Sequence, residues 1–138
     1  MADSVHRLFN AIEPGSYIRP HRHLHPPKAE TLIVVSGALG LLSFDEVGRL
    51  VSTERMDARG ETLGVDVPPG AWHTFVALEP GTVFFETKAG PYAVPSGVDA
   101  ADWAPAEGAP EAAAQEARWR ELFVRAEAPA SRGLYRAE

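Results

Sequence analysis

Three histidines alternate with other residues in the sequence GSYIRPHRHLHPPKAE, which ends at Glu30: His21, His23 and His25. A fourth, His73, follows a Pro-Pro-Gly sequence far along the chain. Because alternate residues of a β-strand point to the same side, two of the first three histidines can reach one ion together with Glu30 and His73. Three imidazole nitrogens and one carboxylate oxygen suit Zn, Fe, Mn, Co, Ni or Cu and leave positions open for water or substrate. The spacing alone does not decide which two histidines of the segment bind.

Other side chains with useful chemistry are expected beside the histidines. A strand over residues 16–25 would place Tyr17 and Arg19 on the histidine face. Arginine there suits a carboxylate, phosphate or sugar-phosphate ligand, and the alternative is an ion pair with a cavity carboxylate such as Glu86. Glu86 is costly to bury unless it is paired, which makes it a candidate acid–base group together with Tyr17. The candidate catalytic residues are therefore Tyr17, Arg19 and Glu86.

The elements that must position these residues are short β-strands. Glycine and proline number 12 each and separate runs of β-prone residues. We expect strands at residues 5–12, 16–25, 30–36, 38–44, 49–53, 62–67, 72–78 and 82–88. Tight turns are expected at FDEVGRL, with Gly48, and at VPPGAWH, with Gly70, because both glycines allow the positive φ that such turns require. This pattern predicts an all-β sandwich or barrel.

The end of the chain has a different composition. The sequence GPYAVPSGVDAADWAPAEGAP, from Gly90 to Pro110, is rich in Pro, Gly and Ala and predicts a surface loop. The following sequence, PEAAAQEARWRELFVRAEA, predicts a helix with one apolar stripe: Trp119, Leu122, Phe123 and Ala126. We expect a β-barrel over residues 1–95, and a loop and helix over residues 96–138 that pack on the barrel or on a partner subunit.

Charge and composition exclude several classes of partner. The formal net charge is -6 and no block of basic residues is present, which argues against nucleic acid and anionic membranes as partners. The apolar runs are too short for a membrane helix, and the first residues lack the pattern of a signal peptide. The chain has no cysteine, so any metal must be held by histidine and carboxylate. We expect a soluble cytoplasmic protein with a small-molecule ligand.

The residues around the histidines resemble the two sequence motifs of the cupin superfamily. The first motif is matched by Gly15, five residues, His21-Arg22-His23, Glu30, six residues and Gly37, with a gap before Glu30 about two residues longer than usual. The second is matched by Pro68-Pro69-Gly70-Ala71-Trp72-His73. Two departures are the upstream glycine, for which Gly64 is the nearest counterpart, and the asparagine after the histidine, which is Ala77 here.

The resemblance extends to one family of cupin-fold metalloproteins, the WbuC family. The sequences PGSYIRPHRH, LLSFDEVGR, VPPGAWHTFVALEPGTVFFETKAGPY and WAPAEG carry it, between Arg7 and Gly108, and the long gap is included. The resemblance implies a cupin-type barrel (a double-stranded β-helix or jelly roll) and a bound divalent metal. In several bacteria it also implies genes near surface-polysaccharide loci. It implies no established reaction.

The resemblance also favours one ligand set. Five residues between Gly15 and the first histidine select His21 and His23, with Glu30 and His73 as the remaining ligands. A four-residue gap before Glu30 would instead select His23 and His25. We expect the first set, binding Zn, Fe, Mn or Ni, because the longer gap contains two prolines and resembles a loop insertion.

Two functions are compatible with such a site. The first is a metal-dependent enzyme, of isomerase or oxygenase type, acting on a sugar-like or carboxylate- or phosphate-bearing ligand. The second is a non-catalytic, metal-dependent binding or regulatory module. Small cupins commonly pair through sheet edges, and an open edge strand needs protection, so a homodimer is also expected.

Overall fold

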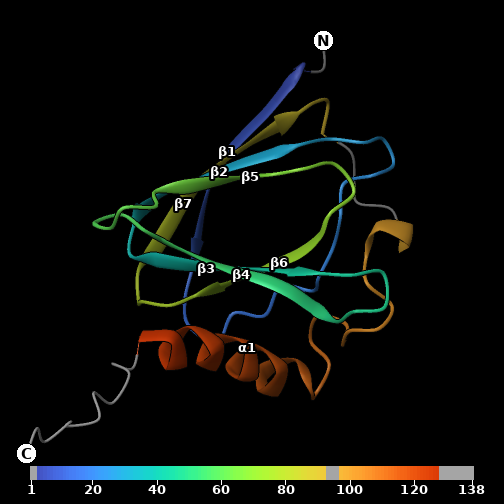
Figure 1. Cartoon of the computed structure of the whole chain (residues 1–138). Coiled ribbons are helices and arrows are strands. Elements are labelled where there is room, and N and C mark those ends of the chain that lie inside the picture. The colour runs from blue at the N-terminus through green and yellow to red at the C-terminus, as the bar shows by residue number, and fades with distance from the viewer. Residues whose placement is uncertain (1–2, 93–96, 128–138) are drawn as a thin grey trace, which may run out of the picture.

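Two antiparallel sheets pack face to face (Figure 1). The computed structural model describes residues 3–92 and 97–127. One sheet has the order β1 (Val5–Ile12), β7 (Thr82–Ala89), β2 (Glu30–Ser36) and β5 (Gly64–Val67), and the other has the order β4 (Leu50–Asp57), β3 (Ala38–Phe44) and β6 (Trp72–Ala77). A short 3-10 helix, Gly97–Asp99, and the helix α1 (Ala112–Glu127) follow. The prediction of an all-β fold with a C-terminal helix is confirmed.

The core forms between the two sheets because apolar residues alternate along the strands. In β7 the buried positions alternate with half-buried ones, and Phe84 packs against Phe75 with ring centroids 5.8 Å apart. β6 differs, since all six of its residues are buried. Its two faces are both covered, one by the opposite sheet and the other by α1, which lies on the outer side of this sheet (Figure 1).

The helix docks through a face that the sequence predicted only in part. Trp119 and Phe123 are buried as expected, but Leu122 is 38% exposed. Its place is taken by Glu116, whose Oε1 accepts hydrogen bonds from the backbone N–H of Gly15 and from Arg120 Nε, each at 3.1 Å. A carboxylate that ties the helix to a distant turn could not be inferred from an apolar stripe. The side chain of Ala126 lies outside the described residues.

One predicted strand is wrong. Residues 16–25 form no strand, and within them only His21 and Leu24 make isolated bridges, His21 to His73 and Ala100. Pro20 lacks the N–H that a strand ladder needs at that position, and prolines again follow His25. The other seven predicted strands are present within a few residues of their expected ends.

The expected tight turns are also present. Gly48 has φ 81° and Gly70 has φ 77°, as the turn sequences require. The boundary expected near residue 95 stays a prediction, and residues 1–2, 93–96 and 128–138 lie outside the described residues. Among the helices described, none is both long and apolar enough to cross a membrane.

Candidate metal centre

The residues predicted as ligands meet between the two sheets. His21 and His23 come from the segment between β1 and β2, Glu30 begins β2, and His73 lies in β6. One potential ligand atom from each lies within 4.8 Å of those of the other three. Glu30 and His73 are buried, whereas His21 and His23 are half-buried, so the cluster is closest to solvent on the side of these two histidines.

The irregular segment is fixed to the sheet by its backbone. The N–H of His21 donates to the carbonyl of His73 and the N–H of His73 donates to the carbonyl of His21, both at 2.9 Å. The carbonyl of His23 accepts from the N–H groups of Lys28 and Gly70, each at 3.1 Å. The turn at Gly70 therefore positions His23 as well as His73.

Hydrogen bonds set the protonation of two rings. His21 Nδ1 lies 3.1 Å from the carbonyl of Arg19, and His73 Nδ1 lies 2.8 Å from the carbonyl of Ala71. Because a carbonyl only accepts, each Nδ1 carries a proton, and Nε2 is the nitrogen left to face the cluster, where that of His73 lies 3.1 Å from Glu30 Oε2. This is how metal-binding histidines are usually oriented.

An unpaired nitrogen also fits a metal. His23 Nε2 is buried without a hydrogen-bond partner, 3.5 Å from Glu30 Oε1. A buried polar atom without a partner is costly, and an ion would satisfy it. Three imidazoles and a carboxylate match the donors that divalent transition metals prefer, so the residues present fit such an ion.

The charges of the cluster suit a cation. Burial alone would raise the pKa of Glu30, but its close contacts with His23, His73 and Glu86 and the charge of Lys88 hold it well below its usual range. Burial and the neighbouring His73 lower the pKa of His21 to about 3. At neutral pH the site thus offers an ionised carboxylate and a neutral imidazole, the forms that bind metal.

A lysine that the sequence analysis missed joins the two acidic residues. Lys88 Nζ donates to Glu30 Oε1 at 2.9 Å and to Glu86 Oε1 at 2.5 Å, and Asn10 Nδ2 donates to Glu86 Oε2 at 3.0 Å. The register pairs Glu30 with Lys88, so both point between the sheets. The alternation of residues 84, 86 and 88 was the signal that could have found Lys88.

One expected contact, between Arg19 and Glu86, is corrected. The alternative ion pair between them is wrong, because Glu86 pairs with Lys88 while Arg19 Nε donates to the carbonyl of Ala101 at 2.7 Å. Burial is the largest cause of a raised pKa for Glu86, and the hydrogen bond and charge of Glu30 add to it. Glu86 therefore holds a proton more readily than a free glutamate.

Arg19 lines a pocket that reaches the cluster. The pocket has a volume of about 430 Å³. Its lining residues are Ile18, Arg19, His21, Asp99, Ala100 and Glu107. His21 is the member of the candidate ligand set found in this lining, so the pocket approaches the cluster from the half-buried side.

Tyr17 lies elsewhere. Its ring stacks on Trp119 of α1 with centroids 5.7 Å apart, and its hydroxyl donates to the carbonyl of Pro105 at 2.7 Å. The prediction that it shares the histidine face depended on a strand at residues 16–25, and without that strand the alternation does not hold.

His25 is turned to a different partner. His25 Nδ1 lies 2.9 Å from Asp99 Oδ1, and its side chain is 54% exposed. Asp99 Oδ2 accepts from the backbone N–H of His25 at 3.1 Å, and the Asp99 carbonyl accepts from the N–H of Arg22 at 2.9 Å. Asp99, which the sequence analysis also missed, thus anchors the segment that carries two candidate ligands.

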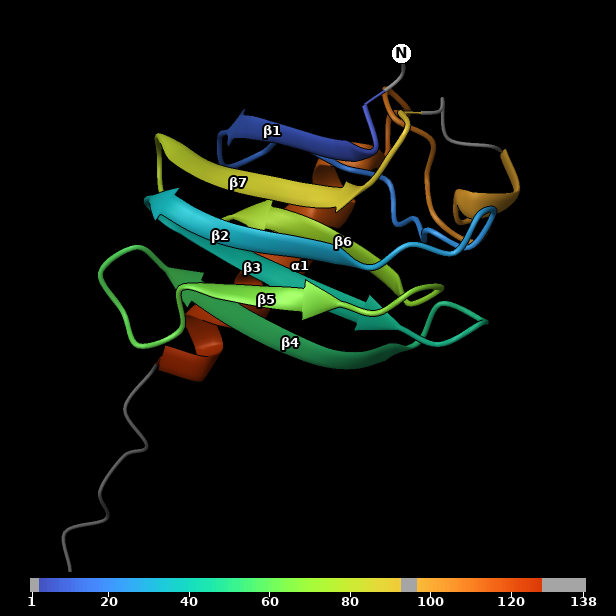
Figure 2. The same ribbon diagram turned by 90° about the horizontal axis from the view of Figure 1, so that it is seen from above.

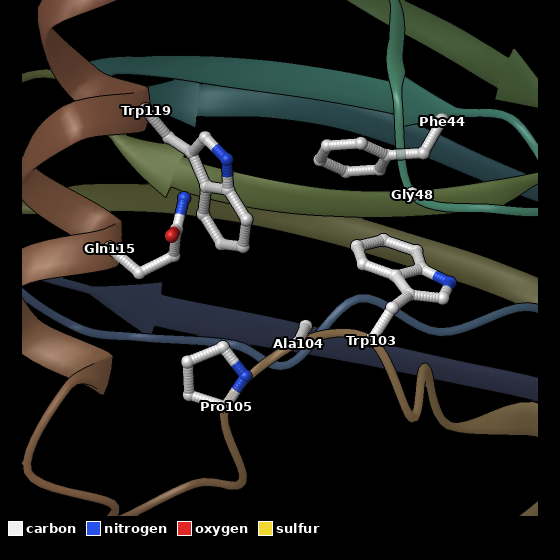
Figure 3. A pocket seen from close by; sticks show the side chains of 7 residues that line it. All are labelled: Phe44, Gly48, Trp103, Ala104, Pro105, Gln115 and Trp119. Carbon is white, nitrogen blue, oxygen red and sulfur yellow. The ribbon is translucent and has the colours of Figure 1, made fainter.

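A second, smaller pocket lies between α1 and the loop that follows the 3-10 helix, as Figure 3 shows. Its volume is about 130 Å³. Phe44, Gly48, Trp103, Ala104, Pro105, Gln115 and Trp119 line it. None of the candidate metal ligands is in this lining, so it is separate from the cluster.

Comparisons with known proteins establish the fold. A family model described as "Domain of unknown function (DUF6016)" matches residues 1–56. A search of curated proteins found no match. A mutant of Bacillus subtilis oxalate decarboxylase OxdC is 22% identical, with a TM-score of 0.53, over 67% of this chain and 23% of that chain.

Two further solved structures are similar. A double mutant of ChmJ, a 3'-monoepimerase from Streptomyces bikiniensis in complex with dTDP, is 19% identical, with a TM-score of 0.56, over 67% of this chain and 49% of that chain. KdgF from Halomonas sp. is 20% identical, with a TM-score of 0.50, over 65% of this chain and 71% of that chain. The chain thus spans about a quarter of the length of the oxalate decarboxylase it matches. The predicted cupin-type barrel is confirmed.

Proposed function

We propose that this chain binds one divalent transition-metal ion through His21, His23, Glu30 and His73 and holds a small oxygenated ligand beside it. The observation that carries the proposal is the convergence of these four side chains, with a buried His23 Nε2 that has no other partner. Zn, Fe, Mn and Ni all accept this donor set. Manganese gains some support because Mn(II) centres are described in Bacillus subtilis oxalate decarboxylase, which has the same fold.

The ligand is proposed to carry a carboxylate or phosphate. Arg19 lines the pocket that reaches His21, and its Nε is fixed by the carbonyl of Ala101. The terminal nitrogens of the guanidinium would bind the anionic group in a fixed orientation. Solved structures of this fold include an oxalate decarboxylase with formate and a 3'-monoepimerase with dTDP, which are both anionic ligands.

The bound metal would act as a Lewis acid on a ligand oxygen. Within the chain, Glu86 is placed to hold or release a proton at its carboxyl group, because its pKa is raised and it is linked through Lys88 to Glu30. Tyr17 has no part in this proposal, since its hydroxyl is bonded to Pro105. Membership of the WbuC family, with surface-polysaccharide synthesis as the setting, belongs to the proposal and is supported by sequence resemblance.

Metal content tests the first half of the proposal. The protein, purified without tag or chelator, is expected to contain about one transition-metal ion per chain, and His23→Ala is expected to lose it. His6→Ala is the matched control, because His6 lies in β1 against Tyr92 and outside the cluster. Absence of metal from the wild-type protein, even after reconstitution with each of the four ions, would contradict the proposal.

Ligand binding tests the second half. Calorimetric titration of the metal-loaded protein with oxalate and with a nucleoside diphosphate is expected to show binding of at least one of them. Arg19→Gln is expected to weaken it roughly tenfold while metal content stays unchanged. Product analysis of the same mixtures separates conversion from binding alone. An affinity that is equal in Arg19→Gln and the wild type would contradict the assigned role of Arg19.

A further inference from the structure

The outer face of the sheet β1-β7-β2-β5 is apolar and uncovered. α1 lies on the other sheet, so no described element covers this face (Figures 1 and 2). The register places the following residues on it: Val5, Arg7, Phe9 and Ala11 of β1; Val83, Phe85, Thr87 and Ala89 of β7; Thr31 and Ile33 of β2; and Gly64 and Asp66 of β5. Val35 and Ser36, at the bulge of β2, are exposed beside them.

One row across this face is entirely apolar. The register aligns Phe9, Phe85, Ile33 and Gly64 from one edge of the sheet to the other. Phe9 is 67% exposed and Ile33 is 43% exposed, and the rings of Phe9 and Phe85 lie 5.2 Å apart. The row is therefore uneven, with a large exposed ring at the β1 edge and no side chain at the β5 edge.

The neighbouring row carries opposite charges at its two ends. It consists of Arg7, Thr87, Thr31 and Asp66 in register order. Arg7 lies at the β1 edge, and Asp66, at the β5 edge, accepts a hydrogen bond from Thr31. These are the two charged residues among the outward positions of the paired strands, and Arg7 also pairs with Asp3, which precedes β1, at 3.0 Å.

We propose that this face is the interface of a homodimer, with two sheets packed face to face about a two-fold axis nearly parallel to the strands. Such an axis lies midway between β7 and β2, and it places β1 of one protomer over β5 of its partner. Phe9 then projects over the partner's Gly64, and Arg7 lies over the partner's Asp66. Each contact occurs twice, as two-fold symmetry requires.

Both rows are complementary to themselves under this operation. The largest side chain meets the position with none, and each charge meets its opposite. Packing against a second copy in this arrangement requires the two ends of each row to match each other in size and in charge. Packing against an unrelated partner does not require this match. Aligned packing of sheets about 10 Å apart is also a common arrangement of two β-sheets.

The size of the face is adequate for a specific dimer. With about 4.8 Å between strands and about 3.3 Å per residue, the four strands cover roughly 400 Å² in projection. Side-chain relief brings the surface removed from both protomers to roughly 1,000 Å², near the lower limit for specific interfaces. We therefore expect a dimer that dissociates on dilution into the micromolar range.

Light scattering during size exclusion and sedimentation at several concentrations measure the association. The wild-type protein is expected at twice the chain mass of 14.9 kDa at the higher concentrations. Phe9→Glu is expected to be monomeric. Val51→Glu, at an equally exposed position (67%) on β4 of the other sheet, is the matched control and is expected to remain dimeric.

A charge exchange tests the proposed symmetry. Arg7→Asp places two pairs of like charges in the dimer, and so does Asp66→Arg, so each variant alone is expected to dissociate roughly tenfold more readily. An equimolar mixture of the two variants is expected to recover the wild-type affinity, because the heterodimer restores both pairs. Circular dichroism checks that each variant is folded.

Three results would overturn the proposal. The first is a wild-type protein that remains monomeric at about 100 µM, which would leave the face for another partner. The second is a dimer that survives Phe9→Glu, which would point to another surface such as the edge of β1. The third is a mixture of the charge variants that associates no better than either variant alone.

Discussion

Lys88 places a positive charge next to a site proposed for a cation. It bridges the carboxylates of Glu30 and Glu86, both of which are buried. Burial, the largest single effect, would lower the pKa of Lys88, but the charges and hydrogen bonds of Glu30 and Glu86 together raise it. In the metal-free protein this ammonium is therefore the cation that compensates the two acids.

Replacing Lys88 should make the protein depend more on its metal. Lys88→Met is expected to lower the free energy of unfolding by about 2 kcal/mol in chelator, because it leaves two buried carboxylates beside each other. With metal bound the loss should be smaller, since the ion supplies positive charge to Glu30. Urea unfolding with and without metal measures both values.

The control for this substitution is Lys28→Met, which removes the same charge from a lysine that donates to the carbonyl of Pro91. It is expected to change the free energy of unfolding by less than about 0.5 kcal/mol. A loss of stability in Lys88→Met that is the same with and without metal would show that the lysine does not substitute for the ion.

At the scale of single residues, the sequence was informative where residue type limits the chemistry. Histidine and glutamate at these spacings are suited to metal binding, and His21, His23, Glu30 and His73 do lie together. Lys88 was missed because lysine is common on surfaces, so its type carries little information. Its role follows from the register, which pairs it with Glu30.

At the scale of elements, the segment that carries His21 and His23 depends on Asp99 in addition to its backbone bridge to His73. Burial alone would raise the pKa of Asp99, but hydrogen bonds from the side chain and N–H of His25 and from the N–H of Leu24 outweigh it and lower the pKa. The ionised carboxylate is thus the form that holds the segment in place.

Asp99→Asn is expected to destabilise the protein by about 1–2 kcal/mol at pH 7, because an amide offers one acceptor oxygen where the carboxylate has two. A lowered folded-state pKa means that the contribution of Asp99 is complete above its unfolded value of 3.8 and is lost as pH falls through the folded value. The difference between wild type and variant should therefore begin to narrow only below about pH 4 and keep narrowing as the pH falls further. Urea unfolding at a series of pH values measures it.

The same variant should weaken metal binding roughly tenfold, because Asp99 orients ligands that it does not itself touch. A stability difference that stays constant from pH 7 to pH 3 would exclude the carboxylate charge as the cause. Unchanged metal affinity would show that the segment keeps its position without Asp99.

The contact between α1 and β3 depends on a glycine. A Cβ added to Gly40 would lie 2.5 Å from Cζ of Phe123, which is buried in the cluster beneath the helix. Gly40→Ala is expected to lower the free energy of unfolding by about 2 kcal/mol, because the ring cannot move without disturbing its neighbours. Thermal and urea unfolding measure the loss.

A double variant separates crowding from other effects of the alanine. In Gly40→Ala with Phe123→Leu the smaller side chain makes room for the new methyl group, so the two losses should be less than additive. Strict additivity would mean that the two residues do not compete for the same space. Metal content is expected to be unchanged in all three variants.

Elements were predictable where a local pattern governs them. β1, β2 and β3 have the expected boundaries, because alternating or continuous apolar runs end at turns. Residues 16–25 have residue types suitable for a strand but contain Pro20. Their conformation is set instead by hydrogen bonds to distant residues such as His73 and Asp99. Gly40 inside a strand was the local sign of a close approach, but the sequence does not identify Phe123 as the residue that approaches.

At the scale of the whole molecule, the candidate site joins parts that the sequence keeps separate. Glu30 belongs to one sheet, His73 to the other, and His21 and His23 to the segment between β1 and β2. The barrel itself could be expected from short strands and from the resemblance to cupins. The sequence did not predict which sheet the helix covers, because the docking of the helix also uses Glu116 and a turn at Gly15.

Because the four candidate ligands link both sheets and the irregular segment, metal binding should stabilise the entire fold rather than one loop. An ion that binds only the folded state adds about 2.7 kcal/mol to the free energy of unfolding at a free concentration one hundred times its dissociation constant. The wild-type protein and His6→Ala should show this increase as a higher midpoint of urea unfolding, and His23→Ala should show little of it.

Two signals test whether the whole fold is stabilised. Fluorescence of the tryptophans and far-ultraviolet circular dichroism should shift together, because one cooperative transition involves both sheets and the helix. An equal increase in His23→Ala would place the ion elsewhere, and a shift confined to one of the two signals would limit its effect to part of the structure.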